Sequence, residues 1–573
     1  MNLSFLNKIK PGIIVPLTVL FVILFDIGIT HKYGWIYLIS VYLYLPLFLL
    51  NSLKTFLTLR QTTSKLFVIT TMILAFIALV CLIALQTPFF ILENNVINII
   101  LIFLIIIDFA EKSFVSLNQI LNPALTFVAT FFGIILIGSA LLMMPNSSTK
   151  EMHYIDALFT STSAVCVTGL TVLDTGKDFT GLGQAIILIL IQVGGLGILV
   201  FTNLFGILFK GEKSYKDLIF LQELISADSL QNTFRSLQKI VGFVFIVEFI
   251  GTMCVLYACP NEGLFFAVFH SISAFCNAGF STLTNSLYEV GFKYNYNFHL
   301  AIAFLIIIGG FGYNIAFNIV SVYKYRLQLL LFDYSSVFKP KKPGRVKWGL
   351  NTALVVWTTL ILLIFGTVTF FYLEYNNTLS EHGLYGKLVT SFFASVTPRT
   401  AGFNSIDMTQ MLSSTVMIYL LLMWIGASPG STGGGIKTTA FAIASLNLLN
   451  QIRGEKLLIL MNKTIPTEIV SRIMTIIALS LIAIGLGMTM ILSLQPDLNP
   501  LHVAFECFSA YGTVGLTLGL TAKLTTASKI IIILLMFLGR VSFLNFLIAL
   551  FSTFMKKKNA HTLEYPETKI FVN

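Results

Sequence analysis

The chain has 573 residues, of which 56% are hydrophobic and only 11% are charged, whereas an ordinary soluble domain has about 25% charged residues. This composition excludes a soluble globular protein, and the net charge of +11 has to be explained in a membrane setting. Apolar runs of about 20 residues, long enough to cross a hydrocarbon layer of about 30 Å, recur along the chain. We therefore predict an all-α polytopic membrane protein.

Residues 1–114 contain about four apolar runs, which begin at Ile13, Trp35, Leu66 and Phe89. The first run is not expected to be a cleaved signal peptide, because many similar spans follow and no small-residue cleavage site comes after it. Lys8 and Lys10 precede this run, which favours a cytoplasmic N terminus. Lateral packing or assembly is the default role for this block of extra transmembrane helices.

Many of the basic residues gather in a few connections between apolar runs. These connections contain, among others, Lys210, Lys324, Lys341, Arg453 and Lys556. The alternate connections, such as CPNEG, EYNNTLSEHG and QPDLNP, contain no Lys or Arg. Because basic connections stay cytoplasmic, the alternation records topology. It requires no nucleic acid, and membrane lipid of the anionic inner leaflet is the only acidic partner it implies.

The rest of the chain repeats one pattern four times: an apolar span, a segment of about ten residues, a Ser/Thr/Gly-rich stretch, and a second span. The repeats are centred on Gly169, Gly279, Gly402 and Gly515. We predict four pore repeats, at residues 115–212, 213–340, 341–464 and 465–573, the last with a cytoplasmic tail.

The short segments decide the predicted mechanism. Ten helical residues rise only about 15 Å, half the hydrocarbon thickness, so each segment should enter as a half-helix and return as extended chain. Irregular backbone at membrane depth survives only where it is buried in protein or lines a water-filled cavity. Four such hairpins, entering from the side poor in Lys and Arg, can surround one axis.

The Ser, Thr and Gly residues then form a lining. Glycine lets a carbonyl turn toward the axis without a Cβ clash, and each half-helix directs its negative C-terminal end to the same place. Carbonyl rings replace the hydration shell of a monovalent cation. An anion site would require helix N-termini or clustered arginines instead, so we predict a cation pore.

The sequence resembles the Trk/Ktr/HKT superfamily of potassium transporters, specifically the pore subunit, over roughly residues 115 to 560. The motifs that carry the resemblance are VTGL at Val167, CNAGFS at Cys276, TPRTAGFNS at Thr397, GTVGL at Gly512 and ASPGSTGGGIKTT from Ala427. In that family a glycine at all four filter positions accompanies potassium preference, and a serine in the first repeat accompanies sodium transport. The four glycines of this chain therefore imply potassium.

The resemblance assigns three residues of each repeat to a selectivity filter that binds potassium. They are Val167, Thr168, Gly169, Asn277, Ala278, Gly279, Thr400, Ala401, Gly402, Thr513, Val514 and Gly515.

The third repeat contains a glycine-rich interruption at residues 426–439. A phosphate loop would need GxxxxGK[ST], but Ile436 separates Gly435 from Lys437, and no βα context surrounds it. A plain interhelical turn is one alternative. The resemblance implies an intramembrane gating loop, with flexible Gly433, Gly434 and Gly435 and with Lys437 near its inner end.

Arg540 lies within the last apolar span. A charge at that depth costs at least about 2.5–3.5 kcal/mol, so it should face the interior and have a partner. It is either a structural ion-pair residue, with Glu506 as one candidate partner, or a fixed charge beside the pathway. The resemblance favours a gate residue below the filter.

Other polar residues near the glycines have structural alternatives. Arg399 adds one residue between Ser395 and Gly402 relative to the other repeats, and bracing through carbonyls would explain it. Asp156 and Glu506 are interpretable as surface or helix-capping carboxylates. His270 is interpretable as a histidine of the short helix whose ring nitrogens have hydrogen-bond partners. The six cysteines show no CxxC spacing, so neither a disulfide framework nor a metal site is predicted. We find no catalytic constellation, no enzyme and no cofactor.

We therefore predict potassium uptake across the plasma (inner) membrane of a prokaryote. Because the chain holds no nucleotide-binding domain, the resemblance implies a separate cytoplasmic regulatory ring that binds nucleotide, and a homodimer of pore subunits. A sodium-permeable or weakly selective cation channel of the same family is one rival, since a single glycine per repeat gives a short carbonyl stack. A secondary transporter with broken helices is the rival of another class.

Overall fold

The computed structural model describes residues 123–196, 233–334, 348–455, 457–541 and 547. The extra N-terminal spans and the basic connections around Lys210, Lys341 and Lys556 lie outside these residues. The described part is helical, which confirms the predicted class, and its only strands form a two-residue antiparallel pair, β1 (Ile459–Leu460) with β2 (Lys463–Thr464).

The described helices are grouped into four units, each with a long helix, a short helix and a further helix. The first two units contain α5 (Pro123–Leu142), α6 (Tyr154–Val165) and α7 (Gly181–Leu196), then α10 (Thr233–Ala258), α11 (Gly263–Phe275), η3 (Ser286–Tyr288), α12 (Tyr296–Phe311) and α13 (Tyr313–Tyr334). The last two contain α14 (Leu350–Glu374), α15 (Leu384–Val396), η4 (Met408–Gln410), α16 (Ser413–Trp424) and α17 (Thr438–Ile452), then α18 (Thr467–Leu494), α19 (Pro500–Gly512), η5 (Thr521–Lys523) and α20 (Thr526–Val541).

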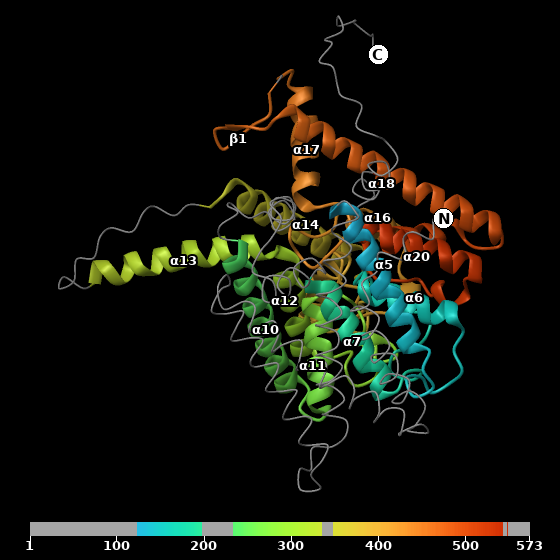
Figure 1. Cartoon of the computed structure of the whole chain (residues 1–573). Helices are drawn as coiled ribbons and strands as arrows, with labels where there is room; N and C mark the ends of the chain where they lie inside the picture. Colours follow the sequence, from blue (N-terminus) through green and yellow to red (C-terminus); the bar gives the residue numbers. More distant parts are fainter. Residues whose placement is uncertain (1–122, 197–232, 335–347, 456, 542–546, 548–573) are drawn as a thin grey trace, which may run out of the picture.

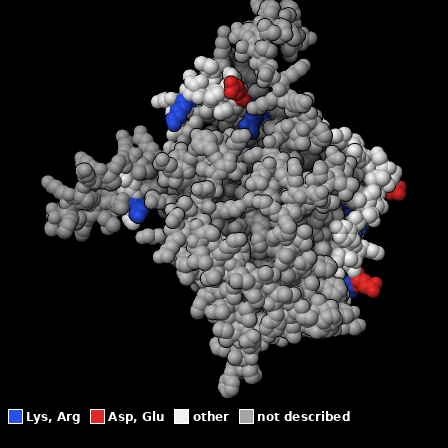
Figure 2. Space-filling model, viewed as in Figure 1, with Lys and Arg blue, Asp and Glu red and all other residues white. Residues whose placement is uncertain are grey.

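Three helices of the described part are long and apolar enough to cross a membrane. They are Gln238–Ala258 of α10, α14 and α18. The four short helices α6, α11, α15 and α19 have 12 or 13 residues each, which gives about 18–20 Å of rise and does not cross a hydrocarbon layer. Figure 2 shows Lys, Arg, Asp and Glu side chains of the described residues near the upper, left and right parts of this face.

The units pack as a closed ring. Each short helix packs against the long helix before it, in the pairs α5 with α6, α10 with α11, α14 with α15 and α18 with α19. Between units, α7 packs on α11, α12 on α15, α16 on α19, and α20 on α6, so the fourth unit returns to the first. Figure 1 shows α7, α10, α11 and α12 side by side in the body, with α13 extending away from it.

The close approach of long and short helices depends on small residues. A Cβ added at Gly138, Gly251 or Gly366 would lie 2.4 Å from the hydroxyl of Ser161, Ser271 or Ser395, respectively. Each of these hydroxyls donates to a carbonyl of the facing long helix, at 2.7–2.8 Å. Small residues at helix contacts let backbones approach within a membrane.

The second unit differs from the prediction at its last span. A second span was expected here as in each repeat, but within the run LAIAFLIIIGGFGYNIAF from Leu300 helices α12 and α13 meet at a bend of 100°. Gly312 between them has φ +80° and ψ 147°, a conformation that glycine adopts without a Cβ penalty. The backbone groups freed by the break bond to the loop after α16: Ser428 donates to Phe311 O, and Tyr313 N donates to Gly430 O.

Local sequence explains where several helices begin. Asn499 accepts from Leu501 N and is followed by Pro500 at the first turn of α19, and Asn295 accepts from Phe298 N at the start of α12. Asparagine caps and a proline at the first helical position are favourable because the first amides of a helix have no intrahelical partner.

Candidate functional site

The structure brings the four glycines of the repeats together. A Cβ added at any of them would lie under 3.0 Å from a backbone carbonyl oxygen of the next unit. In the order Gly169, Gly279, Gly402 and Gly515, these oxygens belong to Ala278, Ala401, Val514 and Thr168. The sequence of contacts runs from the first unit to the second, third and fourth and back to the first, so the glycines surround a shared axis.

Four glycine segments, residues 167–169, 277–279, 400–402 and 513–515, share one backbone conformation. The glycines have φ values of 89°, 72°, 78° and 95°. The first residues of the segments, Val167, Asn277, Thr400 and Thr513, also have positive φ, from 51° to 68°. A positive φ is uncommon outside glycine and clusters at functional sites, where the surrounding structure holds it. Alternating backbone handedness turns successive carbonyls toward the same side of the chain.

The N–H groups of these segments point back into the protein. In the first unit Thr168 N donates to Ser163 O at 2.8 Å and Gly169 N to Ser163 Oγ at 3.0 Å. Val514 N and Gly515 N make the same bonds to Ser509 in the fourth unit, at 2.8 and 3.1 Å.

The second and third units repeat the backbone bond, from Ala278 N to Ser273 O and from Ala401 N to Thr397 O. By contrast, within the described residues no carbonyl of the four glycine segments accepts a hydrogen bond. Buried carbonyls are normally paired, so these oxygens are available to a ligand on the axis.

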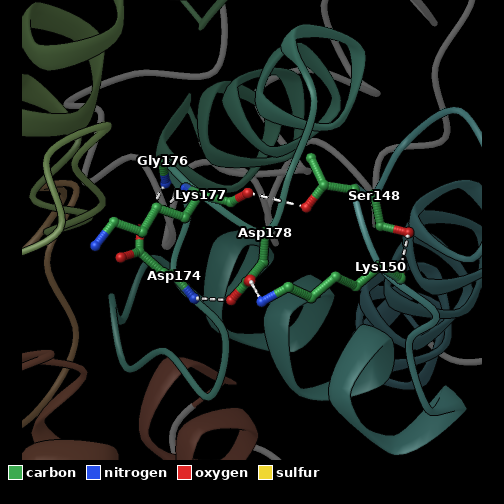
Figure 3. A network of polar contacts seen from close by, with 7 residues as sticks. Ser148, Lys150, Asp174, Gly176, Lys177 and Asp178 are labelled. Atoms are coloured by element: carbon green, nitrogen blue, oxygen red, sulfur yellow. Dashed lines mark hydrogen bonds and ion pairs between the residues drawn. The ribbon is translucent and has the colours of Figure 1, made fainter.

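A cavity of about 370 Å³ opens at one end of the glycine segments. Its wall includes all four glycines, the polar residues two positions after them (Thr171, Ser281, Asn404 and Thr517), and the carboxylates Asp174 and Asp407. Figure 3 shows how the loop of Asp174 is held: Asp174 N donates to Asp178, Gly176 N and Lys177 N donate to Asp174 Oδ1, and Lys150 pairs with Asp178 at 3.4 Å. The Asp174 carboxylate is therefore held on a braced loop at the wall of the cavity.

The glycine-rich interruption lies against the other end of the segments. Gly434 N donates to Thr513 Oγ1 at 3.0 Å, and a Cβ at Gly433 would contact Thr400 Oγ1. Lys437 Nζ donates to Gly433 O at 2.6 Å. The span is broken as predicted, since α16 ends at Trp424 and α17 begins at Thr438.

Arg540 projects toward the same loop. Its guanidinium donates to the carbonyls of Thr432, in the loop, and Gly194, in α7. Gly194, Gly309 and Gly539 each pack on a carbonyl at the end of a short helix. The residue after each is Gly195, Gly310 and Arg540, so the arginine occupies a place that is glycine in the first two units.

The candidate ion pair between Arg540 and Glu506 is absent from the described residues. The Glu506 carboxylate instead accepts from Thr517 and, at 3.0 Å, from Thr521. It lies toward the cavity end of its short helix, away from the glycine-rich loop.

The predicted register of the third repeat was wrong. Ser395 donates to a long-helix carbonyl, as Ser161 and Ser271 do, and Thr397 takes the place of Ser163. Eight residues separate Ser161 from Gly169, but seven separate Ser395 from Gly402. The third unit is thus one residue shorter, and Arg399 is not an addition.

Arg399 also has a different partner from the carbonyls expected. It donates to Thr359 Oγ1 at 3.4 Å, and its Nε has no hydrogen-bond partner among the described residues. His270 is satisfied as predicted, with Nδ1 2.9 Å from Phe266 O and Nε2 2.9 Å from Ser281 Oγ.

Asp156 forms an ion pair with Lys529 that the sequence did not predict. The two residues are far apart in the chain and come together only when the ring closes. Within the described ranges, no group of three or more His, Cys, Asp and Glu residues is placed to hold a metal ion.

Comparison with known proteins identifies relatives. A family model described as TrkH, cation transport protein, matches residues 94–561. The Ktr system potassium uptake protein B of Bacillus subtilis is 36% identical over 78% of this chain and 96% of its own length. The potassium/sodium uptake protein NtpJ of Enterococcus hirae is 34% identical over 79% of this chain and 97% of its own. The crystal structure of the potassium transporter TrkH from Vibrio parahaemolyticus shares the fold, with a TM-score of 0.61 at 17% identity, over 85% of this chain and 98% of that one.

Proposed function

The chain belongs to the TrkH family of cation transport proteins, and from this premise we propose that it mediates potassium uptake through a selectivity filter of backbone carbonyls. The four glycine segments form this filter, and potassium is the substrate. The names of two relatives support potassium as the substrate, because one is a potassium uptake protein and the other a potassium/sodium uptake protein.

One observation carries the proposal: the closed ring of glycine segments whose carbonyls accept no hydrogen bond in the described part of the chain. Such oxygens can replace the water that an alkali cation sheds. The short helices α6, α11, α15 and α19 end where the segments begin, so their negative ends add to the attraction.

The glycine-rich loop is the proposed gate. Gly433, Gly434 and Gly435 lie under the segments, Lys437 braces the loop, and Arg540 ties Thr432 to α7. While these contacts hold, the loop occupies the inner exit of the filter. Opening requires that they break.

The proposal extends to organisation. Pore repeats occupy residues 115–212, 213–340, 341–464 and 465–573, with the gate at 426–439 and the extra helices at 1–114. The chain works in the plasma membrane of a prokaryote with its N terminus in the cytoplasm, as a homodimer gated by a separate cytoplasmic nucleotide-binding ring. It acts as a transporter without a cofactor of its own and without enzymatic activity.

A sodium-permeable or weakly selective cation channel is the second candidate function, because one relative is named as a potassium/sodium uptake protein. A secondary transporter with broken helices is less well supported. Although α12/α13 and α16/α17 are broken spans, the four units form one ring in a single order, whereas that class is built from paired inverted repeats.

The test is potassium uptake by a transport-deficient bacterial strain that expresses the chain or its Gly279→Ser variant. At Gly279, φ is +72° and a Cβ would lie 2.7 Å from Ala401 O. We expect uptake by the wild-type chain, and about a tenfold loss of potassium uptake or of potassium preference over sodium in the variant, which corresponds to about 1.4 kcal/mol.

The control is Gly133→Ser, because a Cβ at Gly133 meets nothing within 4 Å. Equal potassium uptake and equal ion preference in wild type and Gly279→Ser would refute the filter. A wild-type preference for sodium would favour the second candidate.

A further inference from the structure

The outer ends of the second and fourth glycine segments share a hydrogen-bond arrangement. Ser281 and Thr517 each lie two residues after the glycine of their segment and line the 370 Å³ cavity. Eleven residues earlier, on the short helices, His270 Nε2 contacts Ser281 Oγ at 2.9 Å and Glu506 Oε1 accepts from Thr517 Oγ1. A buried acceptor therefore stands behind each hydroxyl, since His270 and Glu506 are both 0% exposed.

The direction of the serine proton follows from the other nitrogen of His270. Nδ1 lies 2.9 Å from Phe266 O, which can only accept, so Nδ1 carries the hydrogen. In a neutral imidazole Nε2 is then an acceptor. The Ser281 hydroxyl must donate to it, as the Thr517 hydroxyl donates to Glu506.

Each hydroxyl oxygen also accepts a backbone N–H from two residues further along. Leu283 N donates to Ser281 Oγ and Gly519 N donates to Thr517 Oγ1, both at 3.0 Å. A hydroxyl has one hydrogen and two lone pairs. Thr521 Oγ1 lies 3.0 Å from both Thr517 Oγ1 and Glu506 Oε2 and has a single hydrogen, which the carboxylate, as the stronger acceptor, takes. The hydrogen and one lone pair of Ser281 and Thr517 are thus used inside the protein, and the other lone pair is left for the cavity.

The first and third units lack this arrangement. Thr171 and Asn404 occupy the places of Ser281 and Thr517, whereas the residues in the places of His270 and Glu506 are Thr160 and Ala394. Thr160 donates to Asp156 O within its own helix. Because the units contact one another in the order first to fourth, the second and fourth face each other across the axis.

We propose that Ser281 and Thr517 form an outer binding site for a partly hydrated monovalent cation, with His270 and Glu506 as positioning residues that keep both hydroxyl protons turned away from it. Two neutral oxygens that present only lone pairs attract a cation without stripping its water. The site concentrates the cation above the carbonyl ring. The inference rests on the proposed function, because it assigns a step that precedes entry into the filter.

The test uses the full chain in proteoliposomes, with rubidium-86 as the probe for uptake. Wild type is compared with Ser281→Ala/Thr517→Val, and the matched control is Thr171→Val, which removes a cavity hydroxyl for which the described part of the chain provides no hydrogen-bond acceptor. We expect the KM for rubidium to be about fivefold higher in the double variant, because the cation loses contacts that are about as strong as a hydrogen bond. Its maximal rate and its rubidium-to-sodium preference should stay within twofold of wild type, and the control should shift KM by less than twofold.

Glu506 variants separate positioning from folding. Glu506→Gln keeps an acceptor oxygen for Thr517 and should retain a near-normal KM, whereas Glu506→Leu should raise KM. Combining Glu506→Leu with Thr517→Val should add nothing further, because both remove the same oriented hydroxyl. Thr517→Ser keeps the hydroxyl that Thr517→Val removes, so its KM should stay close to that of wild type. Melting temperatures in detergent identify any variant whose fold is damaged, and conclusions are drawn from those within about 3 °C of wild type.

An unchanged KM in the Ser281→Ala/Thr517→Val variant overturns the outer site. A loss of ion preference or of maximal rate at constant KM also overturns it, because the hydroxyls would then brace the filter. An equal effect of Thr171→Val overturns the role of the buried acceptors. Failure of the proposed function looks different: Gly279→Ser would leave the ion preference unchanged in the same vesicles, whatever the hydroxyl variants do.

Discussion

Lys529 Nζ lies 2.6 Å from Asp156 Oδ1, and this ion pair joins α20 of the fourth unit to the short helix α6 of the first. It lies at the position where the ring of units closes. The side chains are 14% and 12% exposed, so the pair is mostly withdrawn from solvent.

We predict that Lys529→Met destabilises the protein by roughly 1–3 kcal/mol, because removal of one partner leaves a carboxylate uncompensated in a poorly hydrated place. The double variant Lys529→Met/Asp156→Asn should recover part of this loss. Thermal unfolding in detergent is the measurement. Lys150→Met is the matched control, since Lys150 is 80% exposed in its pair with Asp178 and should contribute less than about 0.5 kcal/mol. Equal losses of stability in Lys529→Met and Lys150→Met would mean that the ring-closing ion pair stabilises the protein no more than an exposed one.

The approach of α10 and α11 gives a second prediction. Gly251→Ala should destabilise the protein by about 1–3 kcal/mol, because its Cβ would lie 2.4 Å from Ser271 Oγ. Gly242→Ala in the same helix meets nothing within 4 Å and should be neutral or slightly stabilising. The difference in melting temperature between the two variants is the readout. A stabilising Gly251→Ala would show that the helices separate more easily than their packing implies.

Arg540 gives a third prediction. Arg540→Gln removes a positive charge and weakens the tie to Thr432 O, so cation flux in proteoliposomes should rise about tenfold, or ~1.4 kcal/mol in barrier height. Arg540→Lys keeps the positive charge but lacks the forked guanidinium donor, so its cation flux should lie between those of wild type and Arg540→Gln. A flux that drops in Arg540→Gln, with normal expression and melting temperature, would show that the arginine supports the pathway rather than obstructing it.

The loop between α14 and α15 gives a pH prediction. Burial and then the nearby Lys293 charge lower the pKa of His382 below its usual range, while Glu381 opposes this shift. The folded state therefore binds a proton less readily than the unfolded state, so acidification below about pH 6.5 should cost stability.

The loss of stability between pH 8 and pH 5 should be smaller in His382→Gln than in wild type. Thermal unfolding across this range measures the difference. Identical pH profiles would mean that His382 titrates alike in the folded and unfolded chain.

The sequence predicted those features that depend on length and backbone chemistry. Segments too short to cross the membrane, glycines that tolerate positive φ, and a glycine-rich break between α16 and α17 all follow from local rules. The gathering of the glycines was also predictable, because a fourfold repeat of half-length segments has few other ways to bury its irregular backbone.

Features that depend on three-dimensional pairing were not predictable. Glu506 was one candidate partner for Arg540 because opposite charges attract, but the Arg540 guanidinium donates to the carbonyls of Thr432 and Gly194, which no charge pattern reveals. The register of the third unit was misjudged because Ser395 was matched by residue type. Its hydrogen bond to Leu363 O identifies its true counterparts. The break at Gly312 had a signal in the run GGFG, yet the apolar residues on both sides suggested a continuous span.

The most direct test of the carbonyl filter is anomalous diffraction from crystals of this protein grown in a rubidium salt. The account predicts rubidium density on the axis enclosed by Gly169, Gly279, Gly402 and Gly515, within coordination distance of the carbonyls of the four glycine segments. An axis without rubidium there, in crystals that bind rubidium elsewhere in the chain, would contradict it.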